Sequence, residues 1–262
     1  MQMKIMIVTN QPPLQIAVRQ AVSEDTVLEA IEVFECDPGD DGNNAISEIM
    51  ANSPSIVLLD IGYPIFSGLK IARRITGSFA GIAVIMLSAN NEEDDSELFE
   101  VAKSGAIDYL KGKRSTGVEI VEAIKQASMG ECPILEKVIS DRKVAWRILK
   151  QFHDMSLITR AMEVASPFNL DLEEMQVLQL VARGTQKNQI TSILGVSELT
   201  INERVSSVLF KLNSNERTYD TFVKVRDSLL SVRLARDGNL FILNAPSASN
   251  LPQLLHDGVQ HQ

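Results

Sequence analysis

Cysteine and histidine are scarce in this 262-residue chain, which holds two cysteines and three histidines. Cys36 and Cys132 are too few for a disulfide framework, and they do not form a metal-binding cluster with the histidines. The sequence also lacks a nucleophile paired with a general base and a glycine-rich phosphate loop. We therefore expect a reduced, cytoplasmic protein that needs no cofactor or metal ion and is not an enzyme.

Long apolar runs are missing as well, since none reaches the roughly 20 residues that span a bilayer. The apolar start, Met1–Val8, is short and runs into polar residues and prolines without a small-residue cleavage site. A buried first strand explains it better than a signal peptide. The chain is 45% hydrophobic, which lets each half bury a core, and its length suits two domains without contact to a membrane.

Positive charge is short in the first half of the chain. Residues 1–130 hold 10 Lys and Arg against 19 Asp and Glu, whereas residues 131–262 hold 15 of each kind. The whole net charge of −9 therefore lies in the first half. Because phosphates repel an acidic surface, any contact with DNA must come from the second half.

Strand and helix patterns alternate over the first 130 residues. β-Branched and apolar runs are typical of buried parallel strands, and a helical pattern follows each of them. This alternation predicts an α/β fold with a doubly wound, five-stranded parallel sheet. The predicted strands are Lys4–Val8, Val27–Phe34, Ile56–Asp60, Ile82–Leu87 and Ala106–Leu110. The predicted helices include Pro13–Val22, Ala45–Ala51 with Asn43 or Asn44 as its cap, Leu69–Ile75 and Ser115–Met129.

The second half is predicted to be all-α, apart from a short strand near residues 239–244. Lys137–Ala165 is predicted as one long helix that ends before Pro167. Shorter helices then continue to Arg236, and the Ser-, Asn- and Pro-rich end is expected to be partly disordered. The predicted domains are a first domain at 1–130, a helical connector at 131–166, a helical domain at 167–236 and a tail at 237–262.

The connector carries an apolar stripe at alternating spacings of three and four. This heptad pattern suits a dimer seam, but two heptads equally suit a single helix that packs on its own domains. The stripe consists of Ala145, Ile148, Phe152, Met155 and Met162, with Thr159 in the gap.

Asp60 ends a predicted central strand, where open α/β sheets place their functional sites. On chemistry alone it is either a reactive carboxylate or the cap of the next helix. The segment Ile56–Leu69, IVLLDIGYPIFSGL, resembles the phosphoacceptor segment of receiver domains, with Asp60 at the aspartate. The resemblance covers residues 4–130 and implies that Ser88, beside Ala89, is the hydroxyl switch residue and that Tyr109 is the aromatic one.

The sequence departs from the receiver pattern where the family binds Mg²⁺. The acidic pair after the first strand is replaced by Thr9 and Asn10, and the family's lysine position falls on Gly112. Hard divalent cations need charged oxygen ligands, so the resemblance implies a receiver that is not controlled by conventional phosphorylation. Two alternatives stay open: an inert domain that packs and dimerises, or a switch driven by a ligand, a partner or protein abundance.

Residues 170–211 resemble the helix-turn-helix of LuxR/NarL-type regulators. Gly195 suits the turn between two helices, Ser197 suits the cap of the second one, and Ile201, Val205, Val208 and Leu209 share one face. Together the two resemblances are those of a NarL/FixJ-type response regulator. They imply a transcription factor that binds double-stranded DNA, with a sensor kinase or another protein as a partner. The alternative is an interaction adaptor that binds no DNA.

The outward face of the second helix supplies the candidate DNA contacts. Glu203 is unusual there, because a glutamate accepts a hydrogen bond from cytosine but repels phosphates. The full candidate set is Lys187, Thr200, Asn202, Glu203, Arg204, Ser206 and Lys211, with Ser207 also outward and Arg217 as a supporting cation. A last helix, Thr218–Val232, carries two apolar stripes, which predicts a homodimer with Phe222, Leu229 and Val232 at the subunit contact.

Overall fold

The computed structural model describes residues 3–25, 28, 31–62, 66–88, 95–111, 117–161 and 169–215. All of them belong to one compact unit, residues 1–218, and a second unit comprises residues 219–262. The predicted helix Thr218–Val232, the short strand near residues 239–244 and the tail lie outside the described residues. The predicted domain boundaries remain predictions.

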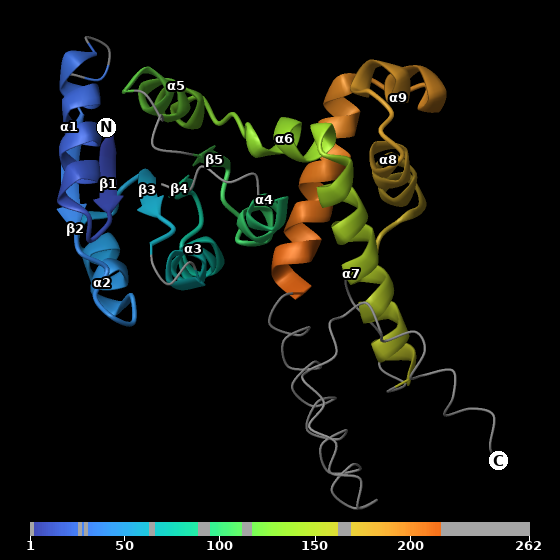
Figure 1. The fold of residues 1–262 in the computed structure, drawn as a ribbon, viewed down its shortest axis with the longest axis horizontal. Helices are drawn as coiled ribbons and strands as arrows, with labels where there is room; N and C mark the ends of the chain where they lie inside the picture. Colours follow the sequence, from blue (N-terminus) through green and yellow to red (C-terminus); the bar gives the residue numbers. More distant parts are fainter. Residues whose placement is uncertain are drawn as a thin grey trace, which may run out of the picture. The chain divides into compact units, whose positions relative to one another are not determined.

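A five-stranded sheet organises the first part of the chain (Figure 1). Its strand order is β2-β1-β3-β4-β5, and every neighbouring pair is parallel. This confirms the predicted doubly wound parallel sheet. The strands are β1 (Lys4–Val8), β2 (Glu32–Cys36), β3 (Ile56–Asp60), β4 (Ala83–Ser88) and β5 (Asp108–Lys111).

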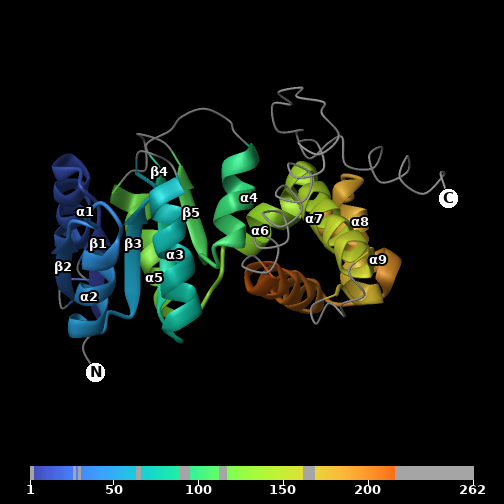
Figure 2. The same cartoon turned by 90° about the horizontal axis from the view of Figure 1, so that it is seen from below.

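Helices cover both faces of this sheet (Figure 2). Successive side chains of a strand point to opposite faces. Ile5 and Ile7 therefore join the core under α1 (Pro12–Glu24) and α5 (Gly117–Ser128), whereas Met6 and Val8 join the core on the other face. The helices of that second face are α2 (Asn43–Asn52), α3 (Phe66–Ser78) and α4 (Asp95–Lys103).

Two local predictions in the sheet domain were wrong. The second strand begins at Glu32 and not at Val27. Leu28 lies in a turn, and its backbone N–H donates to the carbonyl oxygen of Asp25. Helix α2 begins at Asn43 itself, and its cap is Gly42 with a φ of 73°. The side chain of Asp41, rather than an asparagine, accepts the N–H of Asn43.

The connector forms two helices, α6 (Ile134–Ser140) and α7 (Arg142–Ala161), and not the one long helix predicted. Asp141 separates them in an extended conformation. Its Oδ1 accepts the backbone N–H groups of Lys143 and Val144, so a carboxylate at this position starts a new helix.

The apolar stripe of the connector is buried inside this chain. Ala145, Ile148 and Met155 are at most 3% exposed, and α7 packs against α8 (Leu172–Ala182). The stripe therefore serves packing on the chain's own helices, which is the second of the two alternatives. Met162 and the side chain of Thr159 lie outside the description.

The helix-turn-helix consists of α8, α9 (Lys187–Leu194) and a helix described over residues 198–215. Gly195 adopts a φ of 67°, which side chains disfavour, and it turns the chain after α9. The Ser197 hydroxyl accepts the N–H of Thr200 at 3.1 Å, as expected of a cap. No helix among the described residues is long and apolar enough to span a membrane.

Candidate functional site

The Asp60 carboxylate lies at the carboxyl end of β3 and is 7% exposed. Its Oδ2 accepts hydrogen bonds from the Thr9 hydroxyl at 2.7 Å and from the Gln11 amide at 2.9 Å. Its Oδ1 accepts the backbone N–H of Gly62 at 3.0 Å. Three neutral donors therefore hold both oxygens of this carboxylate.

Strand register and a glycine bring these groups together. β1 is the neighbour of β3 and pairs Val8 with Leu59. The next residues, Thr9 just after β1 and Asp60 at the end of β3, therefore lie side by side. On the other side, a Cβ at Gly68 would collide with the carbonyl oxygen of Asp60. Only glycine lets the start of α3 approach the end of β3 this closely.

The donor set does not fit the Mg²⁺ ion that receiver domains use. Among the described residues that contact it, Asp60 meets no second carboxylate, and the Thr9 hydroxyl and the Gln11 amide present hydrogens to it. Asn10 is exposed and makes no hydrogen bond to Asp60. Among the described residues no group of three or more His, Cys, Asp or Glu could hold a metal ion. Gly112 supplies no charge at the family's lysine position, and of the flanking Lys111 and Lys113 the structure describes only Lys111, at the end of β5.

A buried glutamate joins the two residues expected to act as switches. Ser88 donates from its hydroxyl to Oε1 of Glu97 at 3.1 Å, and Tyr109 donates to Oε2 of the same carboxylate at 2.5 Å. All three side chains are less than 10% exposed. Ser88 ends β4, Tyr109 lies on β5, and Glu97 belongs to α4. One carboxylate thus holds both side chains inward.

Sequence reasoning missed Gln11 and Glu97. Glu97 stands beside the acidic run Glu92–Asp95, which points to a solvated helix start. Glu97 lies four residues before Val101, which is buried. Residues four apart share one face of a helix, so this spacing could have indicated that Glu97 is buried too. Gln11 had no comparable signal, since its role depends on the loop after β1.

Cys36 and Cys132 both carry free thiols. Burial raises the pKa of the Cys36 thiol and of the Cys132 thiol to about 11. Both therefore stay protonated near neutral pH, and a protonated thiol is a poor nucleophile.

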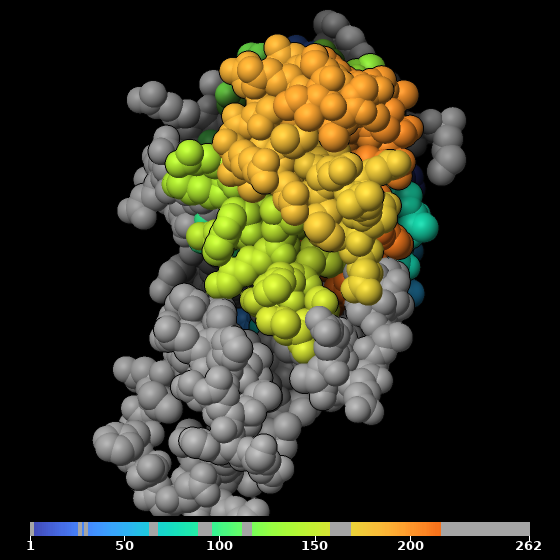
Figure 3. Space-filling view, turned by 90° about the vertical axis from the view of Figure 1, so that its right-hand side faces the viewer, coloured from blue at the N-terminus to red at the C-terminus, as the bar shows by residue number. Residues whose placement is uncertain are grey.

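Lys187 belongs to α9, and the other candidate DNA-contact residues belong to the helix that follows it. Figure 3 shows the surface of α8 in yellow and of α9 in orange. Glu203 and Ser206 are exposed, whereas Thr200, Asn202 and Arg204 are partly buried. The opposite side of this helix is the apolar core, in which Ile201, Val205, Val208 and Leu209 are at most 8% exposed. Ser207 faces inward, because it donates to Glu174 at 2.7 Å.

Every candidate cation described on this surface is paired with a carboxylate. Lys187 pairs with Glu136 of α6 and, at 3.6 Å, with Glu198. Arg204 pairs with Glu173 of α8. Lys211 donates to Glu174 at 2.6 Å and to the carbonyl oxygen of Asn169 at 3.1 Å. The predicted subunit contacts Phe222, Leu229 and Val232, together with Arg217, lie outside the described residues.

Known families match both parts of the chain. The response regulator receiver domain matches residues 5–125, and the luxR family of bacterial regulatory proteins matches residues 170–220. Transcriptional regulatory protein DegU of Brevibacillus brevis is 29% identical over 74% of this chain and 83% of its own length. Response regulator UvrY of Escherichia coli O157:H7 is 25% identical over 86% of this chain and 94% of its own. Transcriptional regulatory protein LiaR of Bacillus subtilis is 28% identical over 73% and 84%.

A receiver fold followed by a luxR-type helix-turn-helix defines a response regulator with a DNA-binding output domain. These matches confirm the predicted resemblance to NarL/FixJ-type response regulators, with a receiver domain followed by a luxR-type helix-turn-helix.

Proposed function

We propose that this chain is a transcriptional regulator whose receiver responds to a signal other than phosphorylation of Asp60. The observation that carries the proposal is the set of bonds from Thr9, Gln11 and Gly62 to both oxygens of Asp60. A nucleophilic carboxylate needs a cation that screens it from the incoming phosphoryl group. Here the three donors are neutral and supply no compensating charge.

The missing positive charge is expected to slow phosphoryl transfer to Asp60 strongly. Loss of charge stabilisation in a phosphoryl transfer typically costs several kcal/mol, which corresponds to orders of magnitude in rate. The hydroxyl of Ser88 and the ring of Tyr109 remain in place around Glu97. The switch positions are therefore present, and a ligand or a partner protein is the input that we favour.

Mass spectrometry tests this part of the proposal. The chain is incubated with acetyl phosphate and Mg²⁺ beside the variant Thr9→Asp/Asn10→Asp/Gly112→Lys. We expect no modification of the natural chain, and modification of the variant at Asp60. An Asp60→Asn version of the variant controls for other acceptors. Substantial phosphorylation of the natural chain at Asp60 would refute the proposal.

DNA contact by the second helix of the helix-turn-helix is the other part of the proposal. Asn202 and Glu203 are the candidates for base recognition, so their substitution is expected to change base preference. Thr200, Ser206 and the cations are candidates for phosphate contacts, which position the protein without specifying sequence. We further propose that the chain acts as a homodimer on two half-sites.

The paired cations favour a second candidate, an adaptor that binds no DNA. A gel-shift series on a selected DNA library, repeated across salt concentrations, separates the two functions. A DNA-binding chain loses affinity steeply as salt rises, because it releases counterions from the phosphates. Binding that survives deletion of residues 166–262, or no binding at low salt, would argue against DNA recognition by this domain.

A further inference from the structure

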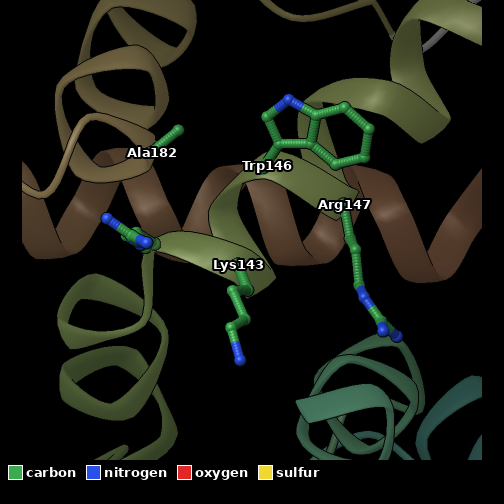
Figure 4. A pocket seen from close by; sticks show the side chains of 5 residues that line it. Lys143, Trp146, Arg147 and Ala182 are labelled. Carbon is green, nitrogen blue, oxygen red and sulfur yellow. The ribbon is translucent and has the colours of Figure 1, made fainter.

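A pocket of about 360 Å³ lies between α7 and α8, and neither Asp60 nor any candidate DNA contact is among the residues that line it. It is lined by Ala182 of α8 and by four residues of α7, namely Arg142, Lys143, Trp146 and Arg147. Figure 4 shows the indole of Trp146 on one side and the side chains of Lys143 and Arg147 extending away from it on the other side. An aromatic ring and cationic groups thus line the same pocket.

The arginines of the pocket differ from the cations of the helix-turn-helix. Among the residues that the structure describes, Arg142 and Arg147 have neither a hydrogen-bond nor an ion-pair partner, whereas Lys187, Arg204 and Lys211 are all paired. The adjacent carboxylate of Asp141 is used to cap α7. Guanidinium groups bind phosphates and carboxylates through parallel hydrogen bonds, so the pocket is suited to an anion.

Trp146 gives the pocket its second property. It is the one tryptophan of the chain and is 56% exposed, although such rings are usually well buried. Lys150 Nζ lies 5.6 Å from the centroid of its ring, a cation–π contact that helps to position the side chain. An exposed indole face is a platform on which a planar ring can stack.

We propose that this pocket binds a small ligand with a planar aromatic ring and a phosphate group, of the size of a mononucleotide. The ring stacks on Trp146, and the phosphate is bound by Arg142 and Arg147 with Lys143 beside them. The volume is near the lower end of the range for ligand pockets, which suits a mononucleotide better than a dinucleotide. The proposal requires neither phosphorylation of Asp60 nor binding of DNA.

The single tryptophan makes a direct test available. The full chain is titrated with AMP, GMP, CMP and UMP while Trp146 fluorescence is followed, with free N-acetyltryptophanamide as the control for absorption by the nucleotide. We expect saturable quenching by at least one nucleotide. Its nucleoside without phosphate, and inorganic phosphate alone, should each bind at least about tenfold more weakly, a loss of about 1.4 kcal/mol.

Variants test whether the fluorescence quenching comes from binding in this pocket. Arg142→Gln/Arg147→Gln is expected to weaken binding at least about tenfold. Arg183→Gln removes an exposed charge that does not line the pocket and should leave binding unchanged. Equilibrium dialysis with radiolabelled nucleotide extends the test to Trp146→Phe and Trp146→Ala, of which only Phe keeps a ring to stack on. Circular dichroism confirms that each variant is folded, and Arg147→Lys replaces the double variant if it is not.

Three results would overturn the proposal. The first is the absence of saturable quenching by all four nucleotides at millimolar concentration. The second is equal affinity for a nucleotide and for inorganic phosphate, which would remove the role of the ring. The third is quenching by duplex DNA alone, which would make these cations part of a DNA surface.

Discussion

The phenol oxygen of Tyr109 donates a 2.5 Å hydrogen bond to Oε2 of Glu97, and both side chains are buried. The bond joins β5 to α4, and the other oxygen of the carboxylate accepts from Ser88 at the end of β4. A buried charge is stable only when polar groups surround it. The inward position of Tyr109 is therefore tied to the presence of this glutamate.

Tyr109→Phe is expected to lower the free energy of unfolding by about 1–3 kcal/mol, because it removes a donor from a buried carboxylate. Ser88→Ala should act in the same direction. Ser128→Ala, at an exposed hydroxyl that donates to a carbonyl of its own helix, is the control and should have little effect. Urea denaturation followed by circular dichroism measures all three. If Tyr109→Phe is as stable as the natural chain, the bond to Glu97 contributes nothing.

Lys211 contacts a carboxylate that is 1% exposed, that of Glu174. Lys211→Met is expected to cost about 1.5–3 kcal/mol of stability, because hydrogen bonds to charged groups are worth that much. Adding Glu174→Gln should recover part of the loss, since no charge is then left unpaired. Thermal unfolding of both single variants and the double variant measures this coupling. Equal instability of Lys211→Met and the double variant would contradict it.

The folded double variant then isolates the role of Lys211 in DNA binding. If Lys211 contacts a phosphate, binding to all sequences should weaken alike, and the salt dependence should become shallower by about one unit of slope. An unchanged slope would assign Lys211 to the fold alone.

Most strands and helices could be predicted from the sequence, because the spacing of hydrophobic residues indicates which side of an element is buried. Lys4–Val8 and Ile56–Asp60 were predicted with the bounds that the structure shows. Asp141 was missed because helix propensity continues on both sides of it, and only its capping bonds to the next turn reveal the break.

The site was less predictable than the fold. Thr9 could be placed next to Asp60 from strand order alone. Glu97 offered only its spacing from Val101 and Glu136 offered no signal, because their roles depend on how separate helices pack, and charged residues on helices usually face water.

Leu229→Asp is expected to convert a dimer into a monomer. Leu229 belongs to the apolar stripe predicted for residues 218–232, and a charge at a subunit contact costs several kcal/mol unless the subunits part. Sedimentation of the full chain measures the change, with Ser231→Asp as a control beside the stripe. If the natural chain is already monomeric at high concentration, this stripe is not a subunit contact.

Glu136→Gln is expected to strengthen DNA binding. The Glu136 carboxylate pairs with Lys187 and accepts a 3.4 Å hydrogen bond from Asn202, so it engages two candidate DNA contacts. In this arrangement Oδ1 of Asn202 is buried without a hydrogen-bond partner. The bond between Asn202 and Glu136 is therefore easier to replace by a contact with DNA. Glutamine keeps the shape of the side chain but removes the charge that competes with phosphate.

The expected gain is up to about fivefold in affinity, because exposed ion pairs are worth about 0.2–1 kcal/mol. Gel shifts of Glu136→Gln at one fixed salt concentration measure it. Glu131→Gln is the matched control, since Glu131 is exposed in the same segment and has no ion-pair partner among the described residues. Equal gains for the two variants would attribute the effect to net charge. In a Lys187→Gln background the gain from Glu136→Gln should shrink, because the cation that it releases is then absent.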